Sequence, residues 1–122
     1  MNETESKAVD ANLLISSGKV EGTAVYNSQG NRLGTISSLM INRASGQVEY
    51  AIMSFGGLFG LGSDHYPLPW AKLDYDPDKH GYVVDLTREQ LLGAPSHRAG
   101  DEPEFDSDYY AAINGFYGAG IW

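Results

Sequence analysis

The segment VEYAIMSF, residues 48–55, constrains the fold of this 122-residue chain more than any other. It carries apolar residues on both parities of an extended strand, with Val48, Tyr50 and Ile52 on one and Ala51, Met53 and Phe55 on the other. Side chains alternate between the two faces of a strand, so a strand of this kind has to be covered on both faces. We therefore expect residues 48–55 to form a strand that is central in the fold or part of an interface.

Segments of strand character lie on both sides of this one and are separated by turns. Residues 19–26 (KVEGTAVY), 33–41 (LGTISSLMI) and 82–86 (YVVDL) are rich in β-branched and apolar residues, whereas NSQGN, NRASGQ and DYDPDKHG are rich in turn formers. The apolar parity changes between Ile36 and Leu39, which predicts a β-bulge or a sharp twist near Ser37 and Ser38. Five or six short strands joined by short turns predict an all-β fold, a small barrel or sandwich.

Two segments have helical features instead. In TREQLLGAP, Thr87 is placed as an N-cap with Gln90 at the capping-box position, and Gly93 and Pro95 end the helix. Near the C-terminus the acidic run DEPEFDSD precedes apolar residues at the spacing of an amphipathic helix, which are Tyr109, Ile113, Phe116 and Tyr117.

The length of the chain suits one hydrophobic core, and the sequence divides into three parts. We expect a flexible lead-in at residues 1–12, a barrel domain at residues 13–97, and an acidic, aromatic extension at residues 98–122.

The charge balance limits the classes of partner. Sixteen acidic residues against eight basic ones give a formal net charge of −8, and no cluster of Lys and Arg is present. Because nucleic-acid affinity depends on cations that neutralise phosphates, we expect no direct binding of nucleic acid. A basic protein partner, or one that offers apolar contacts, fits this surface better.

Membrane insertion and secretion are also not expected. The longest uncharged run, Tyr50 to Ser63, is shorter than the roughly 20 apolar residues of a spanning helix and is rich in glycine. The N-terminal sequence MNETESKAVDAN has neither the positive start nor the apolar core of a secretory signal. We therefore expect a soluble, cytoplasmic protein.

The stretch SFGGLFGLGSDHYPLPW, residues 54–70, contains four glycines that permit a loop between strands, at positions Gly56, Gly57, Gly60 and Gly62. No Gly-Lys-Ser/Thr follows, so the pattern does not indicate a phosphate-binding loop. Leu58, Phe59 and Leu61 are costly to leave in water. They either fold back over the barrel or contact a second copy of the chain, and our hypothesis is the second, a homodimer.

Motifs for catalysis and metal binding are weak. Ser63, Asp64 and His65 are consecutive, so their side chains alternate in direction and cannot converge as a triad. The carboxylates from Asp74 to Asp85 are spaced like a calcium loop, but Lys79 stands where that loop needs glycine. The three histidines, His65, His80 and His97, are far apart in the sequence and give no metal motif. We expect no catalytic residues, no metal and no cofactor.

Three residues before the last strands are expected to be structural, Pro67, Pro69 and Trp70, because proline favours the edges and bends of sheets and a neighbouring tryptophan caps a core. The C-terminal aromatic residues pack either on their own barrel, which is the favoured alternative, or on a partner. The candidate interface residues, apart from the three of the glycine stretch, are Tyr50, Tyr109, Ile113, Phe116, Tyr117 and Trp122.

The order of these motifs resembles the PRC-barrel domain family. The similarity covers about residues 12–97 and rests on a GTAVY strand, the VEYAIMSFGG strand, the GLG loop and the PW pair before the last strands. It implies a small β-barrel of strongly bent antiparallel strands, to which the two helical segments described above add a short helical turn and a helical aromatic appendage. It also implies a module that binds other proteins, is often homodimeric and catalyses no reaction.

Two biological settings follow from the resemblance. One is association with a photosynthetic reaction-centre-type membrane complex, whose H subunit has a cytoplasmic domain of this family. The alternative is ribosome maturation through a RimM-type barrel that binds a ribosomal protein. The net negative charge of the chain favours binding to a basic ribosomal protein.

Overall fold

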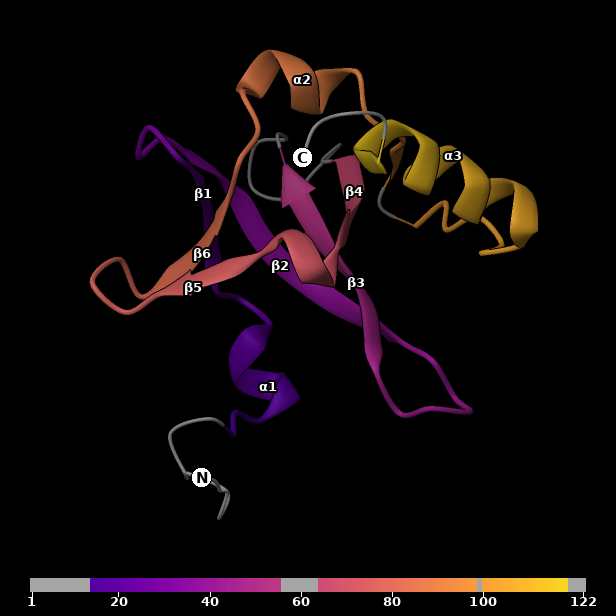
Figure 1. Ribbon diagram of the computed structural model, residues 1–122, viewed down its shortest axis with the longest axis horizontal. Coiled ribbons are helices and arrows are strands. Elements are labelled where there is room, and N and C mark those ends of the chain that lie inside the picture. Colours follow the sequence, from indigo (N-terminus) through magenta and orange to yellow (C-terminus); the bar gives the residue numbers. More distant parts are fainter. Residues whose placement is uncertain (1–13, 56–63, 99, 119–122) are drawn as a thin grey trace.

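A computed structural model of the protein describes residues 14–55, 64–98 and 100–118 (Figure 1). Seven strands form one sheet in the order β5-β6-β1-β2-β3-β4-β7. Their bounds are β1 (Ala24–Asn27), β2 (Arg32–Ile41), β3 (Val48–Phe55), β4 (Asp64–Pro69), β5 (Asp74–Asp76), β6 (Gly81–Val84) and β7 (His97–Arg98). Three α-helices and one 3₁₀ helix complete the described part, namely α1 (Ser17–Val20), η2 (Trp70–Lys72), α2 (Arg88–Leu92) and α3 (Ser107–Gly118). The predicted all-β fold is confirmed.

The sheet is twisted and open rather than closed. Among the described residues, β5 and β7 are its two edges and share no ladder. Five of the six strand pairs are antiparallel, as predicted, but β1 pairs with β6 in parallel. The expectation of antiparallel strands is wrong for this pair because β6 is reached through a long excursion of the chain rather than a hairpin, so it returns beside β1 in the same direction.

β3 is an interior strand of the sheet, which agrees with one of the two alternatives that its sequence predicts. It lies between β2 and β4, and four consecutive residues, Tyr50 to Met53, are buried. The predicted bulge in β2 is also present, because the β2–β3 register shifts between Ile36 and Ser38. Ser37, the extra residue, donates a hydrogen bond from its hydroxyl to the carbonyl oxygen of Ile52 over 3.0 Å.

The expected strand at residues 19–26 is wrong in its first half. Ser16 caps a short helix, α1, by accepting a hydrogen bond from the backbone N–H of Lys19 at 3.3 Å. Gly22 follows with a φ of +89°, a left-handed conformation that glycine adopts without strain. The strand therefore begins only at Ala24.

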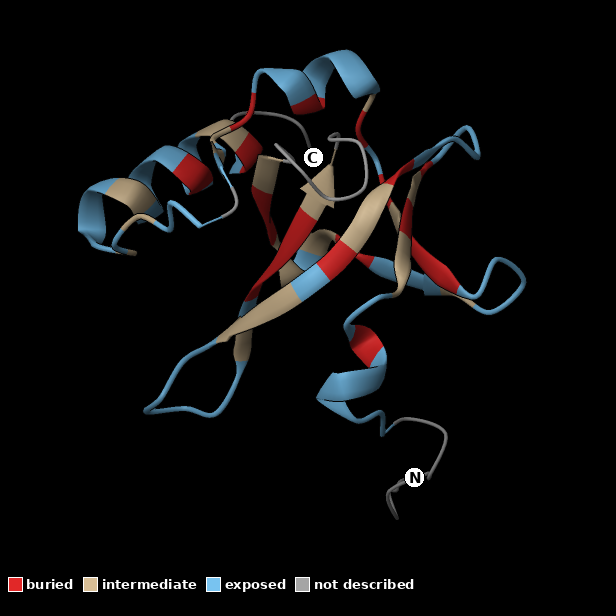
Figure 2. Cartoon of the chain, turned by 180° about the vertical axis from the view of Figure 1, so that it is seen from behind, coloured by how far each residue is buried: buried red, intermediate tan, exposed pale blue. Residues whose placement is uncertain are grey.

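Both predicted helical segments are confirmed. Thr87 and Gln90 form the complete capping box at the start of α2. In α3 the residues Ile113 and Tyr117 are buried, and they join the same hydrophobic core as the strands and as Leu91 of α2. Figures 1 and 2 show α2 and α3 at one end of the sheet and α1 at the other, with the buried residues on the strands and on the inward sides of these helices. No helix in the described ranges is long and apolar enough to cross a membrane.

Candidate functional site

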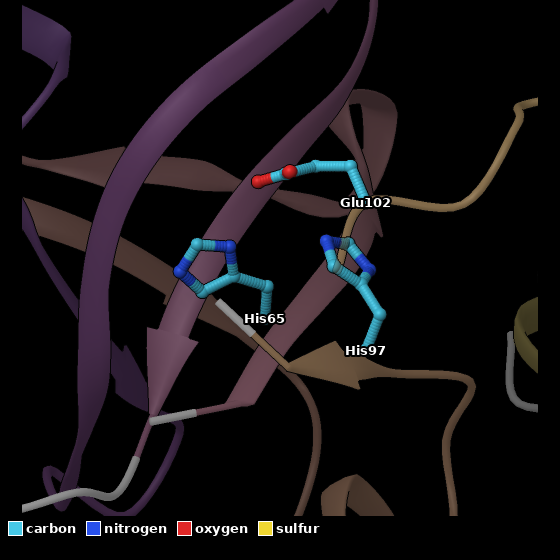
Figure 3. Close-up of side chains that lie close together, drawn as sticks. All are labelled: His65, His97 and Glu102. Carbon is cyan, nitrogen blue, oxygen red and sulfur yellow. The ribbon is translucent and has the colours of Figure 1, made fainter. Parts of the chain in front are cut away.

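The structure brings two of the three histidines together at the edge of the sheet. His65 of β4 and His97 of β7 are direct partners in the antiparallel register. Residues that face each other across such a pair project from the same side of the sheet. Their rings meet edge to face, with centroids 5.4 Å apart and planes at 78° (Figure 3).

Glu102 completes this cluster. After β7 the backbone N–H of Asp101 donates a hydrogen bond to the carbonyl oxygen of Arg98 over 3.0 Å, which closes a tight turn, and Gly100 has a φ of +89°, a left-handed conformation that glycine adopts without strain. The turn reverses the chain, and the exposed carboxylate of Glu102 lies beside the two rings (Figure 3). One potential ligand atom from each of the three residues lies within 4.8 Å of the others.

The two ring nitrogens of His97 have different surroundings. Its Nδ1 lies 3.4 Å from the Tyr109 hydroxyl oxygen of α3, whereas its Nε2 is buried and has no hydrogen-bond partner among the described residues. Burial lowers the pKa of His97, and the neighbouring His65 lowers it further, while the carboxylates of Glu102, Asp101 and Asp64 act in the opposite direction. The net shift favours the neutral imidazole, which keeps a nitrogen lone pair free.

The expectation that the histidines are too far apart to cluster is therefore wrong for His65 and His97. The pairing depends on the register of a two-residue strand, which no local pattern in the sequence indicates. His80 stays apart from them: it is exposed and lies in the turn between β5 and β6, with a φ of 51°. Of the suspected triad, Asp64 lies opposite Arg98 in the β4–β7 pair, and Ser63 lies outside the described residues.

An acidic segment continues from this cluster to the start of α3. Residues 101–108 contain five carboxylates, all exposed, at positions 101, 102, 104, 106 and 108. The segment is fixed by Phe105, whose ring packs edge-on against Tyr109 at 4.9 Å and lies 6.4 Å from the ring of Tyr50. The Asp106 carboxylate accepts a hydrogen bond from the backbone N–H of Tyr109 over 3.0 Å and so caps α3. The charges are thus presented on an anchored surface.

The candidate interface residues fall into two groups. Leu58, Phe59, Leu61 and Trp122, with the four loop glycines Gly56, Gly57, Gly60 and Gly62, lie outside the described residues, and their roles stay predictions. In the described group, Tyr50, Ile113 and Tyr117 are buried within the chain itself, and Tyr109 and Phe116 are half-buried against its core. An interface made by the buried three would first require α3 to leave the sheet.

The two prolines of β4 and the tryptophan that follows this strand lie where sheet geometry allows them. β7 pairs only with Asp64 and His65, so within the described residues the rest of β4 is an edge, where the missing N–H of Pro67 and Pro69 costs no ladder bond. Trp70 begins η2 and packs half-buried on the core, with its ring 5.5 Å from that of Tyr82.

Comparison with known families agrees with this architecture. A model of the PRC-barrel domain matches residues 14–91, which is more than half of the chain. The chain belongs to the PRC-barrel domain family.

Two individual relatives of this PRC-barrel protein are of interest. It is 26% identical over 78 residues to an uncharacterised protein of Deinococcus radiodurans, and the match covers 64% of this chain but only 27% of that protein. The chain therefore spans about a quarter of the length of the curated relative it matches. Among solved structures it is similar, with a TM-score of 0.41 and 20% identity, to a proposed 16S ribosomal RNA processing protein, RimM, from Pseudomonas aeruginosa, covering 66% of this chain and 50% of that one.

Proposed function

We propose that this PRC-barrel protein is a structural, protein-binding module without catalytic activity. Its acidic segment binds a positively charged surface of a partner protein. The observation that carries the proposal is the anchored acidic segment, residues 101–108. The chain also belongs to the PRC-barrel domain family, and the resemblance to this family implies an interaction module. Membership of the family therefore supports the same conclusion.

The physical case rests on charge that is both concentrated and ordered. Five exposed carboxylates within eight residues create a strong local negative potential, and the formal net charge of −8 adds to it over the whole molecule. Such a potential steers a basic partner into contact and discourages acidic ones. Since Phe105 and the Asp106 cap fix the segment, binding does not have to order a mobile tail at an entropic cost.

A pair of matched double variants tests this role. Glu104→Lys with Asp108→Lys changes the acidic segment, whereas Asp78→Lys with Glu89→Lys makes the same change in net charge elsewhere on the surface. All four residues are exposed, and each pair combines one residue outside helices with one in the first turn of a helix. Crosslinking in cells followed by mass spectrometry should recover basic proteins with the unsubstituted protein and with the second variant but not with the first. Equal recovery by both variants would refute the assignment of the segment.

The partner class can then be narrowed by sedimentation. Co-sedimentation with purified ribosomal subunits, lost in the Glu104→Lys and Asp108→Lys variant alone, would identify a ribosomal protein as the partner. Recovery with a membrane fraction, lost in the same way, would favour a reaction-centre-type complex.

We further propose that the working form is a homodimer. The residues between β3 and β4 include Leu58, Phe59 and Leu61, and the strand ends on either side of them are paired, since Phe55 lies opposite Asp64. Large apolar side chains on such a short connection are a natural contact for a second copy. The test is light scattering after size exclusion on the unsubstituted protein and on the Leu58→Ser and Phe59→Ser variant.

The control for this test changes another exposed apolar pair. Leu14 and Ile15 are 71% and 53% exposed, so Leu14→Ser with Ile15→Ser removes similar groups from a different place. A dimer that becomes a folded monomer only in the Leu58 and Phe59 variant supports the proposal. A monomeric unsubstituted protein would contradict it.

A further inference from the structure

We propose that His65, His97 and Glu102 together bind one divalent transition-metal ion, for which Zn²⁺ is the best fit. The proposed role of the protein as a binding module does not require this cluster, so the inference goes beyond that role. It rests on the convergence of three side chains from β4, β7 and the acidic segment.

The ligand types select the class of metal. Two imidazoles and one carboxylate are donors that zinc accepts in proteins, and nitrogen donors disfavour Mg²⁺ and Ca²⁺, which take oxygen ligands. The chain has no cysteine, so a thiolate site is excluded for the whole sequence. A set of three protein ligands leaves a further position for water or another donor.

The geometry is close to that of a bound site. Zinc–ligand bonds of about 2.0–2.1 Å separate tetrahedral ligand atoms by about 3.3 Å. The three candidate atoms already lie within 4.8 Å of one another. The histidines are fixed by the β4–β7 ladder, whereas Glu102 is exposed and free to close the remaining distance by rotating its side chain.

His97 is already arranged as a metal ligand. When its Nδ1 carries the proton, it can donate to the Tyr109 hydroxyl oxygen, 3.4 Å away, and the lone pair is then on Nε2. That Nε2 atom is buried without a partner among the described residues, which is costly for a polar atom. Figure 3 shows a ring nitrogen of His97 on the side of His65 and Glu102, so a metal ion at this position would satisfy it.

A bound ion would join segments that lie far apart in the sequence. It would tie the β4 edge of the barrel to β7 and to the start of the acidic segment, and so hold that segment against the sheet. We therefore expect the melting temperature to rise with Zn²⁺ concentration, since an ion that binds only the folded state stabilises it.

The test is calorimetric titration of ZnCl₂ into the untagged, chelator-treated full chain. The expected result is one ion per chain, with MgCl₂ at the same concentration giving no binding. Glu102→Gln and His65→Ala should each weaken zinc affinity by more than about 10-fold, since even loss of a group that only supports a ligand costs about 10–100-fold. Tyr109→Phe, which removes that support from His97, should weaken it by about 10-fold.

His80 provides the matched control, because it is an exposed histidine outside the cluster. His80→Ala should bind zinc with unchanged affinity. Glu102→Gln alters an exposed side chain and so keeps the test valid even if a histidine variant fails to fold. Zinc binding that is unaffected by Glu102→Gln, that is lost in His80→Ala, or that requires two chains per ion would overturn the proposal.

Discussion

The Tyr50 hydroxyl group donates a hydrogen bond to Oδ1 of Asn114 over 3.0 Å, and this bond joins the middle of β3 to α3 across 64 positions of the sequence. The ring of Tyr50 also stacks on that of Tyr110, with centroids 5.5 Å apart and planes at 29°. A phenol of ordinary pKa is already protonated at neutral pH, and burial raises the pKa of Tyr50 further, so its hydroxyl also remains a donor in mildly alkaline solution. The helix that follows the acidic segment is thus attached to β3 by both polar and aromatic contacts.

A double-mutant cycle should measure this attachment. Tyr50→Phe and Asn114→Ala should each lower the free energy of unfolding by about 1 kcal/mol, the usual net value of one hydrogen bond. The double variant should lose little more than either single one, because both remove the same bond. Urea unfolding gives the three values, and losses that simply add would show that the bond does not contribute.

The burial of α3 gives a second prediction. Ile113 is fully buried in the common core, so Ile113→Ala should lower the free energy of unfolding by about 2–5 kcal/mol. Leu92→Ala is the control, since Leu92 is a similar aliphatic side chain with 62% of its surface exposed and should lose less than about 1 kcal/mol. Equal losses for the two variants in denaturant titrations would mean that α3 is not part of the core.

Features that depend on neighbouring residues could be predicted from the sequence. The capping box of Thr87 and Gln90 spans three positions, and the β2 bulge follows from the parity change around Ser37. The interior place of β3 could be predicted as one of two alternatives, because a strand that is apolar on both faces has to be covered on both, either inside a sheet or at an interface. In each case the determining residues lie within one short segment.

Features that depend on strand pairing could not be predicted in the same way. The meeting of His65 with His97 follows from a two-residue ladder between segments 32 positions apart, and the parallel β1–β6 pair follows from the path of the whole chain between them. The short helix α1 could not be predicted from the sequence for a different reason. Val20 suits a strand as well as a helix, and the deciding signals are the Ser16 cap and the left-handed Gly22 on either side of it.

A third prediction concerns the close approach of β2 to β3 at Gly34. A Cβ atom at this position would overlap the backbone carbonyl oxygen of Ser54 and lie 3.1 Å from Cγ of Met53. Since backbone cannot give way as a flexible side chain does, Gly34→Ala should destabilise the protein by several kcal/mol. Thermal unfolding followed by circular dichroism would measure the change.

Gly115→Ala is the matched control for this substitution. Gly115 lies inside α3, and a Cβ atom there would meet nothing within 4 Å. Alanine is favoured over glycine in a helix, so this change should raise the free energy of unfolding by about 0.5–1 kcal/mol. A melting temperature that falls equally in both variants would show that crowding at Gly34 is not the cause.

The buried Tyr117 makes stability depend on alkaline pH. Burial is the largest cause that raises the pKa of its phenol above the ordinary value of 10.0, and the nearby Tyr66 and Tyr109 raise it further. Below that ordinary value the phenol is neutral in both states, and its contribution to stability is complete. As the pH rises beyond it, the unfolded chain loses the proton while the folded chain retains it, so the free energy of unfolding falls. For this one group the slope reaches about 1.4 kcal/mol per pH unit.

Tyr117→Phe removes this titration and leaves a ring of nearly the same shape. Urea unfolding at intervals from pH 7 to pH 11 should therefore show a smaller alkaline loss of stability in the variant than in the unsubstituted protein, each compared with its own value at pH 7. The other tyrosines with a raised pKa, Tyr50, Tyr66, Tyr82 and Tyr109, titrate in both proteins. The difference between the curves therefore reports Tyr117 together with its coupling to Tyr66 and Tyr109. Parallel curves would show that Tyr117 releases its proton as readily in the folded chain as in the unfolded one.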